Sequence, residues 1–376
     1  MLPQSAGQTV RHHKVAEQDL TFPQELTQAE AAIENKDYAT AEPLLKKVTA
    51  NDPHNYQAWF DLGFVYNGLG NPDESIAAYR KSVAAKPDAF ESNLNLGLML
   101  AKISQPDAEQ FLRAATTLKP ATNQEEGRAR AWLSLGHVLE SNKTEQALDA
   151  YKQASSLLPK DPGPHLSAGA LLQKDSRFAD AEQEYKQVLV LDPNSSDALT
   201  GLANIYMHGN RFADAGEILG KLAALQPNDA HTHMQLGRVL AAAGKNDEAI
   251  AELQTAAKLA PADSDVQRDL ADLYVASGKF DLAEGQYRTL LTSHPADPEL
   301  HHGLGVVLLK QRKFPEAQQE FLATVKLKPD MGGAYGDLAA AAMENKDYAL
   351  AIRATDVRAK FLPEVAPSFF SSRLRL

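Results

Sequence analysis

Ten prolines stand at almost equal intervals along the 376-residue chain, and this spacing constrains the fold more than any other feature. The intervals are 34, 33 and 39 residues and then 34 residues six times, for Pro53, Pro87, Pro120, Pro159, Pro193, Pro227, Pro261, Pro295, Pro329 and Pro363. A period of this length indicates a row of equal units that bury their apolar faces against one another. Counting back from each proline gives ten units over residues 22–365, which begin near 22, 56, 90, 129, 162, 196, 230, 264, 298 and 332.

Each unit carries the pattern of two helices. Apolar residues recur at i, i+3, i+4 and i+7, which is the spacing of amphipathic helices. Gly70, Gly244 and Gly278 fall where a helix ends and the chain needs a positive φ. The proline closes the second helix because its ring and missing N–H forbid continuation. Glycine or alanine at the eighth place of every unit predicts a close crossing of the two helices.

This pattern resembles the tetratricopeptide repeat, whose signature is W-x2-L-G-x2-Y, then A-x3-F, then P. One unit matches it with Trp59, Leu62, Gly63, Tyr66, Tyr79 and Pro87, with Ser75 replacing the alanine, and another with Trp132, Leu135, Gly136, Ala147, Tyr151 and Pro159. The resemblance implies an all-α fold, a right-handed α-solenoid of stacked antiparallel helix pairs. It also implies that the first helix of each pair lines a concave side on which peptides bind.

Three segments depart from the regular repeat. Residues 121–128, ATNQEEGR, lengthen the junction between the third and fourth units, and we expect a surface loop or a slight break in regularity there. Residues 1–21 are polar, without a signal peptide, and are expected to form a flexible tail. Residues 366–376 begin an incomplete further repeat without a polar cap, so this end is expected to meet a partner, to self-associate or to continue in the natural gene.

Composition excludes several classes of function. The formal charge of -11 repels phosphates, so nucleic-acid binding is disfavoured. No apolar run approaches the ~18 residues of a membrane span. Without cysteine the chain has no disulfide, thiolate zinc site or thiol nucleophile. This absence fits either side of a bacterial membrane, so the location stays open between the cytoplasm and export with a signal removed.

No motif for catalysis or metal binding is present. His165, His233 and His301 are spaced by two repeats and occupy the place of Trp59 and Trp132, so packing in the aromatic position is expected. The sequence has no H-E-x-x-H and no G-x-S-x-G motif. We therefore expect no enzyme activity, no cofactor and no metal site.

The sequence favours a scaffold that holds a protein or peptide segment along its first helices. The candidate ligand-binding residues are Phe60, Phe64, Leu94, Leu98, Leu133, Leu166, Asn204, His208, Met234, Arg238 and Arg268. Asn204 is expected to bond the ligand backbone, and Arg238 and Arg268 to meet its carboxylates. The alternatives are packing between units for the leucines and a solvated helix face for the two arginines. The alternative function is a targeting or substrate-recruiting arm of an enzyme whose catalytic part lies outside this chain.

Overall fold

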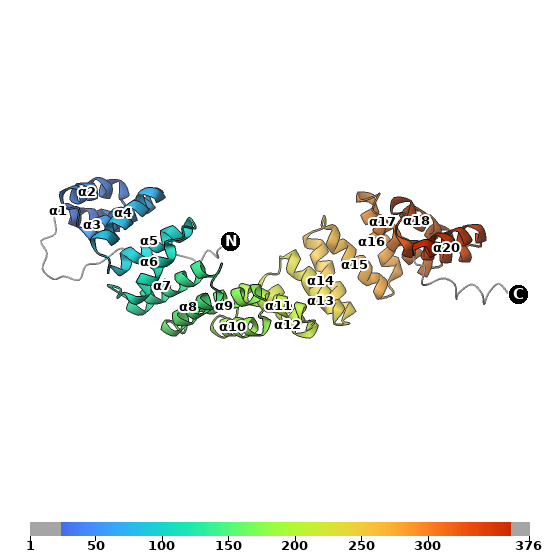
Figure 1. Cartoon of the computed structure of the whole chain (residues 1–376). Coiled ribbons are helices and arrows are strands. Elements are labelled where there is room, and N and C mark those ends of the chain that lie inside the picture. The colour runs from blue at the N-terminus through green and yellow to red at the C-terminus, as the bar shows by residue number, and fades with distance from the viewer. Residues whose placement is uncertain (1–23, 362–376) are drawn as a thin grey trace. The chain divides into compact units, whose positions relative to one another are not determined.

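The computed structural model describes residues 24–361, which form twenty α-helices joined by short turns and, within that range, no strand (Figure 1). The chain divides into an N-terminal unit, residues 1–201, and a C-terminal unit, residues 202–376. The N-terminal unit contains α1 (Gln24–Glu34), α2 (Tyr38–Asn51), α3 (Tyr56–Gly68), α4 (Pro72–Ala85), α5 (Phe90–Lys102), α6 (Ala108–Thr117), α7 (Gln124–Leu139), α8 (Thr144–Leu157), α9 (Gly163–Lys174) and α10 (Phe178–Leu191). Helix α11 (Ser196–His208) crosses the boundary, and the C-terminal unit continues with α12 (Phe212–Leu225), α13 (Ala230–Ala242), α14 (Asn246–Leu259), α15 (Ser264–Ala276), α16 (Phe280–Ser293), α17 (Pro298–Lys310), α18 (Phe314–Leu327), α19 (Gly332–Glu344) and α20 (Tyr348–Phe361).

Within each unit, an odd-numbered helix packs against the helix that follows it and forms a hairpin with it, as α3 does with α4 and α13 does with α14. Within each unit the second helix of a hairpin also packs on the first helix of the next, as α2 does on α3 and α16 does on α17. The predicted all-α solenoid of stacked antiparallel helix pairs is therefore confirmed. The expected tails, residues 1–21 and 366–376, lie outside the described residues.

The loop expected at residues 121–128 is mostly helical. Helix α7 begins at Gln124 and runs for 16 residues, so part of the insertion adds a turn to the start of this helix. Asn123 precedes it with a left-handed φ of 47°. Glutamate in the first turn suits a helix start, because Glu125 and Glu126 lie near the positive end of the helix dipole. The sequence prediction missed this because the insertion interrupts the regular repeat.

The turn between the two helices of a hairpin contains a residue with a positive φ. Glycine occupies this place in only three hairpins. Gly70, Gly244 and Gly278 have φ of 79°, 78° and 69°, as predicted. The same place in six other hairpins also has a positive φ, although its occupant carries a side chain: Lys36, Ser104, Ser176, Asn210, Arg312 and Lys346. The turn keeps this geometry whichever residue stands there, and a residue with a side chain adopts it at a cost of ~1–2 kcal/mol.

Replacing Ser176 by glycine is therefore expected to stabilise the chain. Ser176 is exposed, and its φ of 60° is one that glycine adopts without strain. We expect Ser176→Gly to raise the free energy of unfolding by about 0.5–1 kcal/mol, measured by urea denaturation. The reverse change Gly278→Ser is the control and should lower it by a similar amount. Equal midpoints for both variants would show that the turn is not strained.

The terminating proline keeps a second role after it has ended a helix. In five repeats its carbonyl accepts a hydrogen bond from the side chain at the fourth place of the next unit, six residues later. The donor-to-oxygen distances are 2.9 Å for Trp59, 2.9 Å for Asn93, 3.2 Å for His233, 3.3 Å for Gln267 and 3.0 Å for His301. Tryptophan, asparagine, histidine and glutamine thus each serve as the donor to a proline carbonyl. The histidines at this place therefore form a hydrogen bond in addition to packing against their neighbours.

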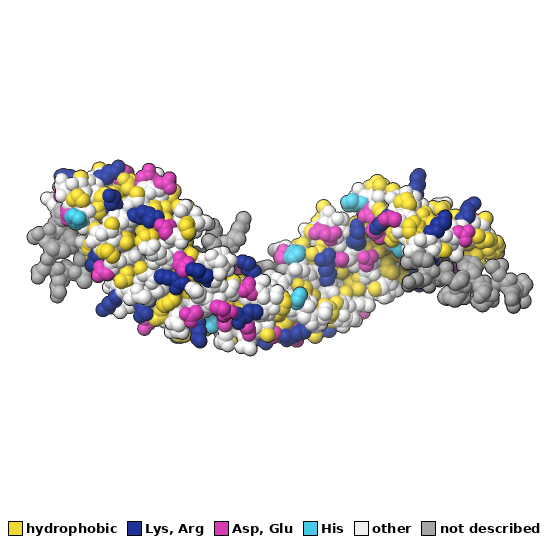
Figure 2. All heavy atoms as spheres, in the orientation of Figure 1, with side chains coloured by type: hydrophobic (Ala, Val, Ile, Leu, Met, Phe, Trp, Pro, Cys, Tyr) yellow, Lys and Arg dark blue, Asp and Glu magenta, His cyan; other side chains and the backbone are white. Residues whose placement is uncertain are grey.

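Charged side chains of both signs are scattered over the face of the molecule shown in Figure 2. On the face shown in Figure 2, Lys and Arg side chains alternate with Asp and Glu side chains over the described helices. This face therefore lacks the continuous basic stripe that nucleic-acid binding needs. Between residues 24 and 361, no helix is long and apolar enough to cross a membrane.

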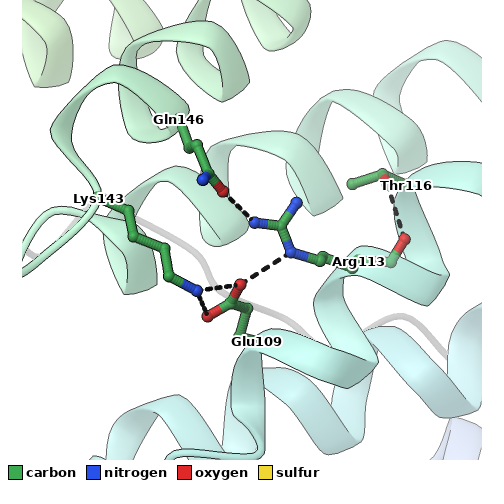
Figure 3. A network of polar contacts seen from close by, with 5 residues as sticks. All are labelled: Glu109, Arg113, Thr116, Lys143 and Gln146. Carbon is green, nitrogen blue, oxygen red and sulfur yellow. Dashed lines mark hydrogen bonds and ion pairs between the residues drawn. The ribbon is translucent and has the colours of Figure 1, made fainter.

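Ion pairs link consecutive second helices within each unit. Glu109 on α6 accepts from Lys143, which precedes α8, at 2.7 Å, and also from Arg113 at 2.9 Å (Figure 3). Lys143 is the largest cause that lowers the pKa of Glu109. The same step recurs as Arg177–Glu145 at 2.7 Å, Lys279–Asp247 at 2.8 Å and Lys313–Glu284 at 2.7 Å. Exposed pairs of this kind contribute ~0–1 kcal/mol each, so they favour the register of stacking more than its strength.

Candidate functional site

The first helices of the N-terminal unit present a row of half-buried apolar side chains. Phe64 on α3, Leu98 on α5, Leu133 on α7 and Leu166 on α9 keep part of their surface in solvent. Leu98 and Leu133 pack against the same core cluster, so they lie on neighbouring helices of one surface. An apolar ligand side chain that covers such a row would remove further apolar area from water.

Three of the predicted ligand-binding residues belong instead to the core. Phe60 is 2% exposed, with its ring centroid 5.6 Å from that of Tyr79, and Leu94 is 5% exposed. Met234 in the C-terminal unit is 7% exposed. These side chains have almost no surface for a ligand, so the prediction that they line a groove is corrected.

The two predicted arginines are already paired within the chain. Arg238 on α13 donates through Nε to Asp269 on α15, and Arg268 on α15 donates through Nη2 to Asp297 at 2.8 Å. Each pair joins one hairpin to the next. Both arginine side chains still keep exposed surface, and Nε of Arg268 is buried without a hydrogen-bond partner, so their contact with ligand carboxylates stays a prediction. Asn204 is half-buried and His208 is exposed, both near the end of α11.

A pocket of about 400 Å³ opens between helices α15, α16 and α17 of the C-terminal unit. Its lining residues are Arg268, Asp272, Tyr287, Glu299, Leu300, His302 and Gly303. The first helices α15 and α17 supply six of the seven, and α16 supplies the tyrosine. Of the predicted ligand-binding residues, only Arg268 lies in this pocket.

Tyr287 forms the inner wall of the pocket because Gly303 leaves room for it. A Cβ at position 303 would lie 2.6 Å from Cε1 of the Tyr287 ring, closer than two carbons can approach. The ring is 3% exposed, and its hydroxyl donates to Oδ1 of Asp272. Burial, followed by this hydrogen bond, raises the pKa of Tyr287, so the phenol keeps its proton.

Salt bridges hold the other polar groups of the pocket. Glu299 accepts from Lys328 Nζ at 2.8 Å, and His302 Nε2 lies 2.8 Å from Oδ2 of Asp337. Both partners come from elements that follow α17 in the chain. The pocket is thus lined by two consecutive hairpins, and Asp337 of the third hairpin pairs with one of its lining residues.

A buried carboxyl marks the first helices of the N-terminal unit. Asp61 on α3 is 2% exposed. Burial raises its pKa well above the usual range, and the charge of Glu30 on α1 adds to the effect. Burial also raises the pKa of Glu30. The neighbouring charge that raises the pKa of Glu30 is that of Glu34 on the same helix.

Asp61→Asn is expected to stabilise the N-terminal unit at neutral pH. The raised pKa means that folded Asp61 binds its proton more tightly than unfolded Asp61, whose pKa is ~3.9. Stability from this group is complete below pH ~4 and falls as the pH rises toward the folded pKa. The asparagine variant should lose this decline, measured by amide hydrogen exchange of α1–α4 between pH 4 and 7. The exposed Asp73→Asn is the control, and a decline that persists in Asp61→Asn contradicts the assignment.

The described residues offer no metal centre. Within residues 24–361, no group of three or more histidine, aspartate or glutamate side chains has the arrangement of a metal site. His233 and His301 instead bond Glu252 and Glu320 through Nδ1, each at 2.6 Å.

Sequence reasoning missed the pocket. Its one signal is Gly303, a second glycine two residues before the expected Gly305. That extra glycine indicates a close approach by a large side chain, but only the structure shows that the side chain is Tyr287.

Comparisons with known proteins agree with this architecture. Residues 16–270 match the family model described as "Cilia and flagella-associated protein 70 C-terminal domain", and residues 240–305 and 302–360 match models described as "Tetratricopeptide repeat". The C-terminal part of a TPR repeat-containing protein from Cytophaga hutchinsonii superposes with a TM-score of 0.56 and 16% identity, over 65% of this chain and 99% of that one. This likeness shows the fold.

Two curated relatives are similar over part of the chain. The Protein CTR9 homolog of Arabidopsis thaliana is 33% identical over 150 residues, which are 38% of this chain and 13% of that protein. The human Protein O-mannosyl-transferase TMTC3 is 22% identical over 174 residues, which are 43% of this chain and 19% of that protein. The chain therefore spans less than a fifth of the length of these relatives.

Proposed function

The chain belongs to the tetratricopeptide-repeat family and, over residues 16–270, to the family of the Cilia and flagella-associated protein 70 C-terminal domain; from this premise we propose that it is a non-catalytic scaffold that binds a protein or peptide segment along its first helices. The repeat fold supports protein interaction in general. Our proposal goes further in two respects: the chain binds a protein or peptide segment, and it does not catalyse a reaction.

One observation carries this proposal. Leu98, Leu133 and Leu166 keep exposed apolar surface on three successive first helices of the N-terminal unit. The part of these leucines that faces solvent adds nothing to the folding of the chain, whereas a partner that covers it gains from its burial. Apolar anchors of a bound segment are the groups that match such a row.

Site-specific photocrosslinking tests the proposal in the cell that makes the protein. A photoreactive phenylalanine at position 166, on first helix α9, should form a crosslink to a partner that mass spectrometry can identify. The same residue at position 153, exposed on second helix α8, is the control and should not capture that partner. Equal capture at both positions, or none at position 166, would refute binding along the first helices.

The second candidate function is a substrate-recruiting arm of an enzyme. The observation that favours it is the similarity to a part of a human protein named as a mannosyl-transferase. The intact mass of the natural protein separates the two functions. A mass well above the 40.8 kDa of this chain would favour the arm, and a mass near that value would favour the free scaffold.

A further inference from the structure

We propose that the first helices α1, α3 and α5 bind residues 1–23 of the same chain, through the basic cluster of residues 11–14, and that this segment competes with the partner for the apolar row. The inference rests on the proposed function and adds its regulation. Residues 1–23 lie outside the described residues, so the proposal is argued from the surface of the N-terminal unit and from the sequence of the segment.

The first helices α1, α3 and α5 carry an excess of negative charge that the second helices lack. They contain one basic residue, Lys102, and five acidic residues: Glu25, Glu30, Glu34, Asp61 and Glu91. The second helices α2, α4 and α6 together contain four acidic and five basic residues. The imbalance is thus confined to the helices that begin the apolar row. Charge complementarity favours a positively charged ligand there.

Like charges are crowded where α1 meets α3. Burial and then the charge of Glu34 raise the pKa of Glu30, and burial and then the charge of Glu30 raise the pKa of Asp61. The hydroxyl of Tyr79, which feels the charge of Asp61, is buried and has no hydrogen-bond partner among the described residues, so it does not compensate this carboxyl group. A cation brought to this place would favour the ionised carboxylates and offset the repulsion.

The segment that precedes α1 carries the matching charge. Residues 11–14 read RHHK, and residues 1–16 contain no aspartate or glutamate. Val10 and Val15 flank the cluster, so cations and apolar side chains alternate along this segment. The surface of α3 has the same mixture, because the half-buried Phe64 lies one turn from Asp61 on the same face of the helix.

The segment is also long enough. From Lys14 to the start of α1 at Gln24, an extended chain spans up to ~33 Å. Neighbouring first helices are in contact, as α1 is with α3 and α5 is with α7, and packed helices lie ~8–10 Å apart. The cluster can therefore reach α3 and α5. Residues 1–10 span another ~33 Å, which is enough to cover the apolar row as far as Leu133 on α7.

Tethering makes such a contact effective even where each ion pair is weak. A segment joined to its own binding surface by a short linker acts at a high effective concentration, on the order of millimolar. A partner that approaches the apolar row must first displace it. The segment would therefore lower the apparent affinity for weak partners and leave the row open to strong ones.

Crosslinking within the full chain tests the contact directly. A photoreactive phenylalanine at position 64 on α3 should crosslink to residues 1–23, as identified by mass spectrometry after proteolysis. The same residue at position 153, exposed on second helix α8, is the control and should not form this crosslink. A mixture of isotope-labelled and unlabelled chains distinguishes a crosslink within one chain from one between two copies.

Exchange of charge tests its physical basis. Arg11→Glu combined with Lys14→Glu should lower the yield of the crosslink about tenfold and raise capture of the partner at position 166. Arg11→Lys combined with Lys14→Arg keeps the charge and should leave both yields unchanged. Adding Glu30→Lys and Glu34→Lys to the first pair of changes should restore the crosslink. High salt should weaken the crosslink of the wild type, because exposed charges are screened.

The outcomes separate this inference from the proposed function. No crosslink between position 64 and residues 1–23, a crosslink between two copies only, or a full yield after Arg11→Glu and Lys14→Glu overturns the inference. The scaffold role then stands on capture at position 166. If position 64 crosslinks to the segment while position 166 captures no partner even in the Arg11→Glu and Lys14→Glu variant, the proposed function is overturned and the contact of the segment is confirmed.

Discussion

Gly305→Ala and Phe321→Ala are expected to destabilise the chain by less in combination than the sum of their separate effects. A Cβ at position 305 would lie 2.7 Å from Cε1 of the Phe321 ring, which is fully buried. Gly305→Ala alone should therefore cost ~1–3 kcal/mol through overpacking. Phe321→Ala alone should cost ~3–5 kcal/mol through the cavity that it leaves. In the double variant the added methyl group enters that cavity, so the coupling should exceed ~1 kcal/mol in favour of stability.

Hydrogen exchange of the α17 and α18 amides is the suitable measurement, because repeat arrays open locally and global unfolding need not be two-state. Gly285→Ala on α16 is the matched control. Nothing lies within 4 Å of a Cβ added there, and the residue is exposed. The better helix propensity of alanine should then stabilise the chain by up to ~1 kcal/mol. If the losses of stability from Gly305→Ala and Phe321→Ala were strictly additive, the glycine would not be required to make room for the Phe321 ring.

This contact explains why the fold was predictable from sequence. The glycine and the aromatic ring belong to one hairpin and lie 15 or 16 residues apart, so the contact recurs in several repeats, as Gly63 with Tyr79 and Gly169 with Tyr185. Gly136 and Tyr151 form another instance, in which an added Cβ would lie 2.3 Å from the ring. A contact that is local and repeated leaves a periodic mark in the sequence.

The surface could be predicted only in part, because exposure depends on the neighbouring hairpin. Phe60 and Phe64 lie one turn apart on the same face of α3, yet the first is buried and the second half-buried. Helical periodicity places both on one face but does not say how far the next hairpin covers it. The pairing of Arg238 with Asp269, 31 residues later, likewise depends on the stacking register. The pocket needs residues of two hairpins at once, which no single repeat encodes.

Replacing His233 by phenylalanine is expected to destabilise the seventh hairpin, α13 and α14, strongly. Its Nδ1 lies 2.6 Å from Oε2 of Glu252, and its Nε2 lies 3.2 Å from the carbonyl of Pro227. His233→Phe keeps a ring of similar shape but removes both bonds, which leaves a carboxylate and a carbonyl without this donor. Each loss should cost ~1–3 kcal/mol, so the free energy of unfolding should fall by about 2 kcal/mol or more.

The chain itself supplies the matched rescue. In the next repeat, Gln267 stands at the place of His233, and Gln286 stands 19 residues later, as Glu252 does. Gln267 donates to the carbonyl of Pro261 at 3.3 Å and accepts from Gln286, so an uncharged pair makes the same two links. The double change His233→Gln and Glu252→Gln should therefore lose no more than ~1 kcal/mol, since each net hydrogen bond is kept. Hydrogen exchange of α13 and α14 distinguishes the variants. If His233→Phe were as stable as the wild type, this place would require only an aromatic ring, and the hydrogen bonds would be incidental to the repeat.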